Sequence, residues 1–231
     1  SNPIRAPQLL EELQDGEREG EFSSSQAQRL LAVPSPTAEA PLGCTFLHQI
    51  DLSAVGQSGF SATLIQDTVS GRFILAVRGT EFPRDIAQDV VDADVFGIAA
   101  GGGVAGPQFA DLLIYVRQLS TAGGQPVVFT DDEVRHLARL RRTDTYYDFG
   151  LRIDVPRTIE ELRAQFGGIF GVGEPGAVAL LGDASFVAVG HSLGGHLASL
   201  AGAYFGSRVT EVVTFNAPGF IAGRFAELLG V

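Results

Sequence analysis

The sequence predicts an α/β fold with a doubly wound, mostly parallel sheet. The order of patterns near the C-terminus is the first reason: residues 185–189 form an apolar strand, 193–205 a small-residue helix, and 208–220 begin as another strand. A strand, a helix and a strand in this order need a right-handed crossover, which makes the strands parallel. The second reason is size, since 231 residues with 45% hydrophobic content can bury one large core.

Earlier segments predict further strands and a helix. Residues 44–52 are rich in strand-forming side chains, and residues 60–68 and 72–80 read as two strands. The turn-forming residues 69–71 lie between these two strands, so we expect a hairpin. Residues 107–119 place apolar side chains at helical spacing.

The domain organisation follows from composition and length. Residues 1–41 are rich in proline and charge and are expected to form an N-terminal arm and linker, while 42–231 form the core. A long insertion is expected at about 121–183. Two helices are predicted within it, because a threonine is followed three residues later by a glutamate at two places. These pairs are Thr130 with Glu133 and Thr158 with Glu161.

Charge and composition exclude several classes of function. The formal net charge of −11 would repel a nucleic-acid backbone. No run of apolar residues approaches the length of a transmembrane helix, which is about 18 residues or more. The single cysteine, Cys44, rules out a disulfide within the chain and is expected to be a small buried hydrophobic residue.

The segment Gly190-His191-Ser192-Leu193-Gly194 carries the chemistry. Its G-x-S-x-G pattern lies between a predicted strand and a predicted helix, which is the context of a nucleophile elbow. A serine on such a tight turn needs small neighbours, and Gly190 and Gly194 meet that need. The N-terminus of the following helix favours negative charge, so the N–H of Leu193 is a candidate oxyanion donor.

The four histidines are not expected to be the catalytic base. His191 belongs to the motif and is expected to pack near the elbow. His196 lies four residues beyond Ser192 on the same helix, which favours a core histidine with its hydrogen bonds satisfied. His136 is expected on the surface of a helix in the insertion, and His48 is expected to be structural.

These motifs together resemble the class-3 lipases. The segments "RFILAVRGT", "GHSLGGHLASLAG" and "VVTFNAPGF" carry the resemblance. It is closer still to the lipase domains of large secreted bacterial proteins that carry calcium-binding repeats, and it covers roughly residues 58–120 and 184–220. The resemblance implies an α/β-hydrolase fold, secretion, and esterase or lipase activity through a Ser-Asp-His triad.

The resemblance also implies roles for individual residues. Ser192 would be the nucleophile, Leu193 one oxyanion donor, and Thr80 the second donor, through its N–H and its hydroxyl. A lid would follow Thr80 at 81–90. The insertion at 121–183 is either a second cover over the acyl groove or a decoration packed on the core, and both alternatives stay open.

No cofactor is required for this chemistry, and a structural calcium ion is the open alternative. Asp89, Asp92 and Asp94 form an acidic cluster that offers oxygen ligands. Their spacing matches no known calcium loop, so a solvated acidic loop is the favoured interpretation.

The sequence shows no evident catalytic acid or histidine to complete a triad with Ser192. Hydrolases of this kind present Ser, then Asp or Glu, then His along the chain. The only acids after Ser192 are Glu211, at the wrong end of its strand, and Glu227, on a final helical run. The triad Asp and His are therefore expected beyond Val231, and a second polypeptide from the same precursor would supply them.

Two functions from different classes follow. The first is a secreted lipase or carboxylesterase that acts on apolar acyl esters at a lipid–water interface, with phospholipase and polyester hydrolase as open variants. The second is a non-catalytic module of hydrolase fold with a binding or structural role. The strained elbow favours the enzyme, because strain of this kind is retained most simply for its chemistry.

Overall fold

The computed structural model describes residues 43–52, 57–79, 105–148, 153–166, 179–220 and 222–230. The predicted N-terminal arm and linker lies outside these residues. None of the described helices combines the length and the apolar character that a membrane span requires.

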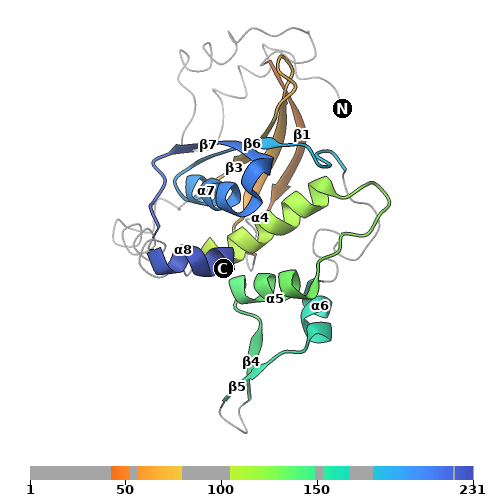
Figure 1. The fold of residues 1–231 in the computed structure, drawn as a ribbon, viewed down its shortest axis with the longest axis vertical. Coiled ribbons are helices and arrows are strands. Elements are labelled where there is room, and N and C mark those ends of the chain that lie inside the picture. The colour runs from red at the N-terminus through yellow and green to blue at the C-terminus, as the bar shows by residue number, and fades with distance from the viewer. Residues whose placement is uncertain are drawn as a thin grey trace, which may run out of the picture.

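A five-stranded mixed sheet forms the centre of the described structure (Figure 1). In spatial order the strands are β1 (Cys44–Asp51), β2 (Ser61–Asp67), β3 (Phe73–Val77), β6 (Phe186–His191) and β7 (Val209–Phe215). The two pairings on the N-terminal side, β1 with β2 and β2 with β3, are antiparallel. The pairings of β3 with β6 and of β6 with β7 are parallel.

The sheet confirms the α/β class and the crossover predicted around Ser192. The hairpin predicted before residue 80 is also present, since β2 and β3 pair in register around the turn at 68–70. The sheet is less parallel than expected, because two of its four pairings are antiparallel. The doubly wound arrangement, with helices on both faces, stays a prediction.

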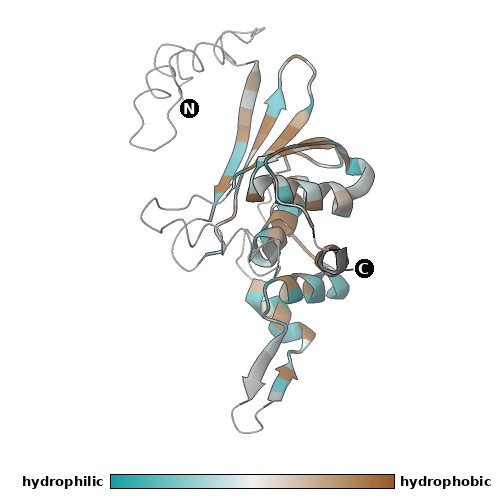
Figure 2. Ribbon diagram, turned by 90° about the vertical axis from the view of Figure 1, so that its left-hand side faces the viewer, coloured by the Kyte–Doolittle hydropathy of each residue, from teal (hydrophilic) through white to brown (hydrophobic). Residues whose placement is uncertain are grey.

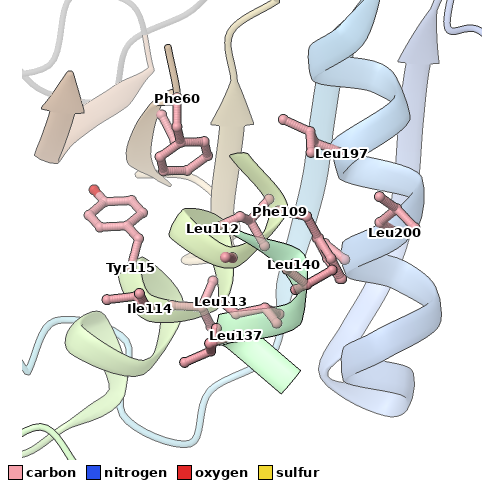
Figure 3. Close-up of a cluster of buried hydrophobic side chains, with 14 of the residues drawn as sticks. Phe60, Phe109, Leu112, Leu113, Ile114, Tyr115, Leu137, Leu140, Leu197 and Leu200 are labelled. Carbon is pink, nitrogen blue, oxygen red and sulfur yellow. The ribbon is translucent and has the colours of Figure 1, made fainter. Parts of the chain in front are cut away.

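Helices pack on one face of this sheet. The longest is α4 (Ala105–Ser120), and α7 (Leu193–Phe205) connects β6 to β7 by way of a short 3-10 turn at Gly206–Arg208. The last described helix is α8 (Ala222–Leu229), which packs against α7. Figure 3 shows how α4 and α7 meet, with Phe109 and Leu112 of α4 facing Leu197 and Leu200 of α7.

One row of side chains across the sheet explains why that face is covered. Leu64, Leu75 and Ala188 are aligned neighbours on three adjacent strands, and each is at most 1% exposed. Residues that are paired directly across neighbouring strands have their side chains on the same face of the sheet, so all three side chains point to one face. Burial of such apolar area against α4 and α7 is the main stabilising contribution to the core.

The insertion holds two helices and a hairpin. α5 (Asp131–Leu140) and α6 (Ile159–Phe166) are separated by the two-stranded sheet of β4 (Thr145–Asp148) and β5 (Ile153–Pro156), which extends away from the main sheet (Figure 1). That hairpin was not predicted. The two capping boxes are confirmed, because Thr130 and Thr158 each exchange hydrogen bonds with the glutamate three residues later.

α5 is amphipathic and packs on the core (Figure 2). The expectation that His136 lies on its surface is wrong, since the side chain is 7% exposed and its ring stacks on Tyr204 with centroids 6.1 Å apart. Tyr204 is about 18 Å along α7 from Ser192, at 1.5 Å per residue. The contact made by α5 therefore lies near the far end of α7, away from Ser192. Both alternatives for the insertion, cover and decoration, stay predictions.

Candidate active site

Ser192 occupies the single position between β6 and α7. Its backbone angles are φ 53° and ψ −127°, a combination that L-residues rarely adopt. The Ser192 hydroxyl makes no capping hydrogen bond to α7, and the side chain is half-buried. The hydroxyl is therefore not used to stabilise the helix, and the strand–turn–helix geometry predicted for this motif is present, while the role of Ser192 as a nucleophile stays a prediction.

The two glycines of the motif are required by close backbone contacts. A Cβ atom on Gly190 would lie 2.3 Å from the carbonyl carbon and oxygen of Gly194. A Cβ atom on Gly194 would lie 2.2 Å from the carbonyl oxygen of Val77, at the end of β3. Both distances are far below van der Waals contact, so the turn leaves no room for any side chain at these positions.

The end of β3 lies against the elbow. A Cβ atom on Gly79 would be 2.8 Å from the carbonyl oxygen of His191 and 3.6 Å from Cβ of Ser192. Gly79 is thus a direct neighbour of the candidate nucleophile. Thr80, the predicted second oxyanion donor, follows Gly79 in the chain but lies outside the described residues.

Leu193, the other predicted oxyanion donor, is the first residue of α7 and is 2% exposed. The first N–H groups of a helix have no acceptor within the helix, and the helix dipole places partial positive charge there. A negative oxygen next to Ser192 would meet that end of α7. Leu193 therefore begins α7 as expected, and its role as an oxyanion donor stays a prediction.

The backbone of the elbow is also held by β7. The N–H of Ser192 donates to the carbonyl oxygen of Phe215 over 2.8 Å. Asn216, the next residue, has a φ of 49°, in the left-handed region that asparagine tolerates better than most residues. This contact was not predicted, although an asparagine directly after a predicted strand is a signal for such a turn.

His196 is a core histidine, as predicted. The side chain is 3% exposed, and its Nδ1 lies 3.2 Å from the carbonyl oxygen of Pro218, so that Nδ1–H donates to it. Burial lowers the pKa of His196, and the bond to Pro218 opposes that shift in part. The bond at Nδ1 alone does not exclude a base, because a catalytic histidine also binds an acceptor through one ring nitrogen. Among the described residues, however, no hydrogen bond joins the His196 ring to the Ser192 hydroxyl, so His196 is not assigned as its base.

The other predicted residues are distributed around the sheet. His191 ends β6 and is exposed rather than packed. Nδ1 of His48 lies 2.9 Å from the hydroxyl of Tyr115, which is consistent with a structural role for His48.

Glu211 lies at the end of the sheet opposite Ser192. It forms an exposed ion pair with Arg72 over 3.6 Å, at the amino ends of β7 and β3. Cys44 is half-buried, and burial together with nearby Asp67 raises the pKa of its thiol.

Several predicted features lie outside the described residues. These are the lid at 81–90 and the acidic cluster of Asp89, Asp92 and Asp94. In the described part of the chain, no group of three or more His, Cys, Asp and Glu side chains is placed to hold a metal ion. Glu227 lies on α8, within Ala222–Leu229.

Comparison with known proteins returned no match. No protein-family model, no curated protein and no solved structure was found to be similar to this chain.

The strain at Ser192 leads to a stability prediction. A positive φ of this kind costs a non-glycine residue about 1–3 kcal/mol. Ser192→Gly relieves that strain but adds conformational freedom to the unfolded chain, whereas Ser192→Ala keeps the strain. We expect Ser192→Gly to exceed Ser192→Ala in unfolding free energy by about 1 kcal/mol. Urea unfolding of the two variants measures this difference. Equal midpoints would show that the strain relieved by glycine is no larger than the entropy that glycine adds to the unfolded chain.

Proposed function

We propose that this chain is a serine hydrolase of the α/β-hydrolase type, a lipase or carboxylesterase that cleaves apolar acyl esters. The observation that carries the proposal is the backbone of Ser192, strained at φ 53° and ψ −127° between a parallel strand and a helix. Backbone strain at a non-glycine residue, with glycines at closely packed positions on either side of it, is typical of a functional turn.

The chemistry assigned to the site is acyl transfer. The Ser192 hydroxyl oxygen attacks the ester carbonyl carbon while a base takes its proton, and a tetrahedral oxyanion forms. The N–H groups of Leu193 and Thr80 would stabilise that oxyanion. The alcohol leaves with a proton, and water then hydrolyses the acyl-enzyme and restores Ser192.

The base and its carboxylate are assigned to a second polypeptide segment of the same precursor. The described histidines support this assignment, because among the described residues no hydrogen bond joins the His196 ring to the Ser192 hydroxyl, and His136 is stacked on Tyr204, about 18 Å away along α7. We further propose a secreted enzyme that meets its substrate at a lipid–water interface. No cofactor is needed for the reaction.

Labelling by a fluorophosphonate tests this function. We expect one adduct per chain in the intact mass, mapped to Ser192, and none in Ser192→Ala. The adduct requires a base within reach of the serine, since removing one member of a triad removes most of the reactivity. A second polypeptide carrying that base should therefore appear in the same denatured spectrum.

The same experiment decides between the two function classes. Ser192 that stays unlabelled although the second polypeptide is present in the preparation would refute the enzyme. The non-catalytic module of hydrolase fold would then be the remaining interpretation.

A further inference from the structure

Phe220 is an exposed aromatic residue close to the candidate nucleophile. It is the last residue of the described segment 216–220, which follows β7, and 37% of its surface is accessible to solvent. Exposing part of a phenylalanine ring to water is unfavourable. A ring that is both exposed and firmly held is therefore a candidate for contact with an apolar ligand.

His196 places Phe220 beside the elbow. The N–H of His196 donates to the carbonyl oxygen of Ser192 over 3.1 Å, so these residues are one helical turn apart. The rings of His196 and Phe220 are stacked, with their centroids 4.1 Å apart. Nδ1 of the same histidine also holds the carbonyl oxygen of Pro218.

A second aromatic contact fixes the ring from another side. Phe225 of α8 meets Phe220 edge to face, with centroids 4.6 Å apart and planes at 63°. Phe225 itself is packed against the core cluster. The ring of Phe220 is thus held by the buried His196 and the partly buried Phe225, while part of the ring stays open to solvent.

Phe215 is also close to Ser192 along the backbone, but its side chain lies on the other face of the sheet. Its carbonyl oxygen binds the N–H of Ser192, and its side chain is 56% exposed. Val212 lies on the α7 face, since its methyl group would touch a Cβ on Gly202 at 2.6 Å. Phe215 is three positions further along β7, and side chains alternate, so it points to the opposite face.

We propose that Phe220 is a specificity-determining residue: its exposed ring, held by His196 and Phe225, forms the wall that contacts the apolar chain of an ester bound at Ser192. This inference rests on the proposed function and adds to it a preference for long, uncharged acyl chains. The formal net charge of −11 favours neutral over anionic ligands.

Tryptophan fluorescence tests the proposal without catalysis. The chain contains no tryptophan, so Phe220→Trp would carry a single indole at the site. Titration with decanol and hexanol, both neutral, should give a saturable blue shift of the emission. We expect decanol to bind more than about tenfold more tightly than hexanol, because four further methylenes leave water.

Two matched variants serve as controls. Phe215→Trp places the indole near Ser192 in the backbone but on the other face of the sheet, and Phe46→Trp places it on β1, where Phe46 is 62% exposed. We expect no saturable shift from either. A shift of equal size in all three variants, or in Phe215→Trp alone, would overturn the proposal, as would no shift in Phe220→Trp.

Measurements at several protein concentrations distinguish binding of an apolar chain from association with a second copy of this protein. If Phe220 were covered by a second copy, the emission of Phe220→Trp would change with protein concentration in the absence of alcohol, and that result would also refute the proposal. Fluorophosphonate labelling of the parent reports on the proposed function independently. Labelling without an alcohol response would overturn the role of Phe220 and leave the hydrolase in place.

Discussion

Gly194→Ala is expected to destabilise the fold by at least about 3 kcal/mol and to abolish labelling of Ser192. The new methyl carbon would lie 2.2 Å from the carbonyl oxygen of Val77, 2.8 Å from the carbonyl carbon of Arg78 and 2.9 Å from the nitrogen of Gly79. All three are backbone atoms, so no side-chain rotation relieves the contact. The start of α7 must instead move away from β3, and the elbow is lost with it.

Thermal unfolding measures this effect. For a chain of this size, 3 kcal/mol corresponds to a decrease in Tm of about 6–12 °C. Gly219→Ala is the control, because no atom lies within 4 Å of a Cβ at that position and its φ is not in the left-handed region. A Gly194→Ala protein with the parent's Tm would contradict the close approach of β3 and α7.

Arg141→Met is expected to lower the unfolding free energy by about 3 kcal/mol. Arg141 caps α5 and donates a hydrogen bond to the carboxylate of Asp111 on α4, whose side chain is 2% exposed. The substitution leaves that carboxylate buried without its cation. The guanidinium also lies 5.6 Å from the ring centre of Phe166, so the variant loses a contact with α6 as well.

A double-mutant cycle isolates the ion pair. In the Arg141→Met background, Asp111→Asn should recover about 2 kcal/mol, because a neutral amide costs less to bury than an unpaired carboxylate. Urea unfolding of the four proteins provides the cycle. Arg135→Met, an exposed arginine on the same helix, should change stability by less than about 0.5 kcal/mol. Additive effects of Arg141→Met and Asp111→Asn would show that the two groups do not interact.

Local sequence patterns predicted most of the elements that surround the candidate site. The apolar run that became β6, the helix after Ser192 and both capping boxes depend on residues a few positions apart, and each is present in the structure. The G-x-S-x-G spacing likewise predicted the tight turn, because the steric demand lies within five consecutive residues.

Contacts between distant segments were harder to predict. His136 was expected at the surface, but Tyr204, 68 positions later, stacks on its ring, and Gly230, the residue after α8, also lies against the imidazole. The β4–β5 hairpin was not predicted, because each of its two strands has only four residues and is too short to show an alternating pattern.

The sequence by itself determined that Ser192 stands on a strained turn between a strand and a helix, since glycine and serine spacing specify local backbone geometry. Only the tertiary structure decided what surrounds that turn: β3 against Gly194, the Phe215 carbonyl on the Ser192 N–H, and Phe220 on the ring of His196. These contacts join segments that are far apart in the chain or face one another only after α7 has packed on the sheet. They depend on the registration of β3, β6 and β7, which burial of the whole core selects.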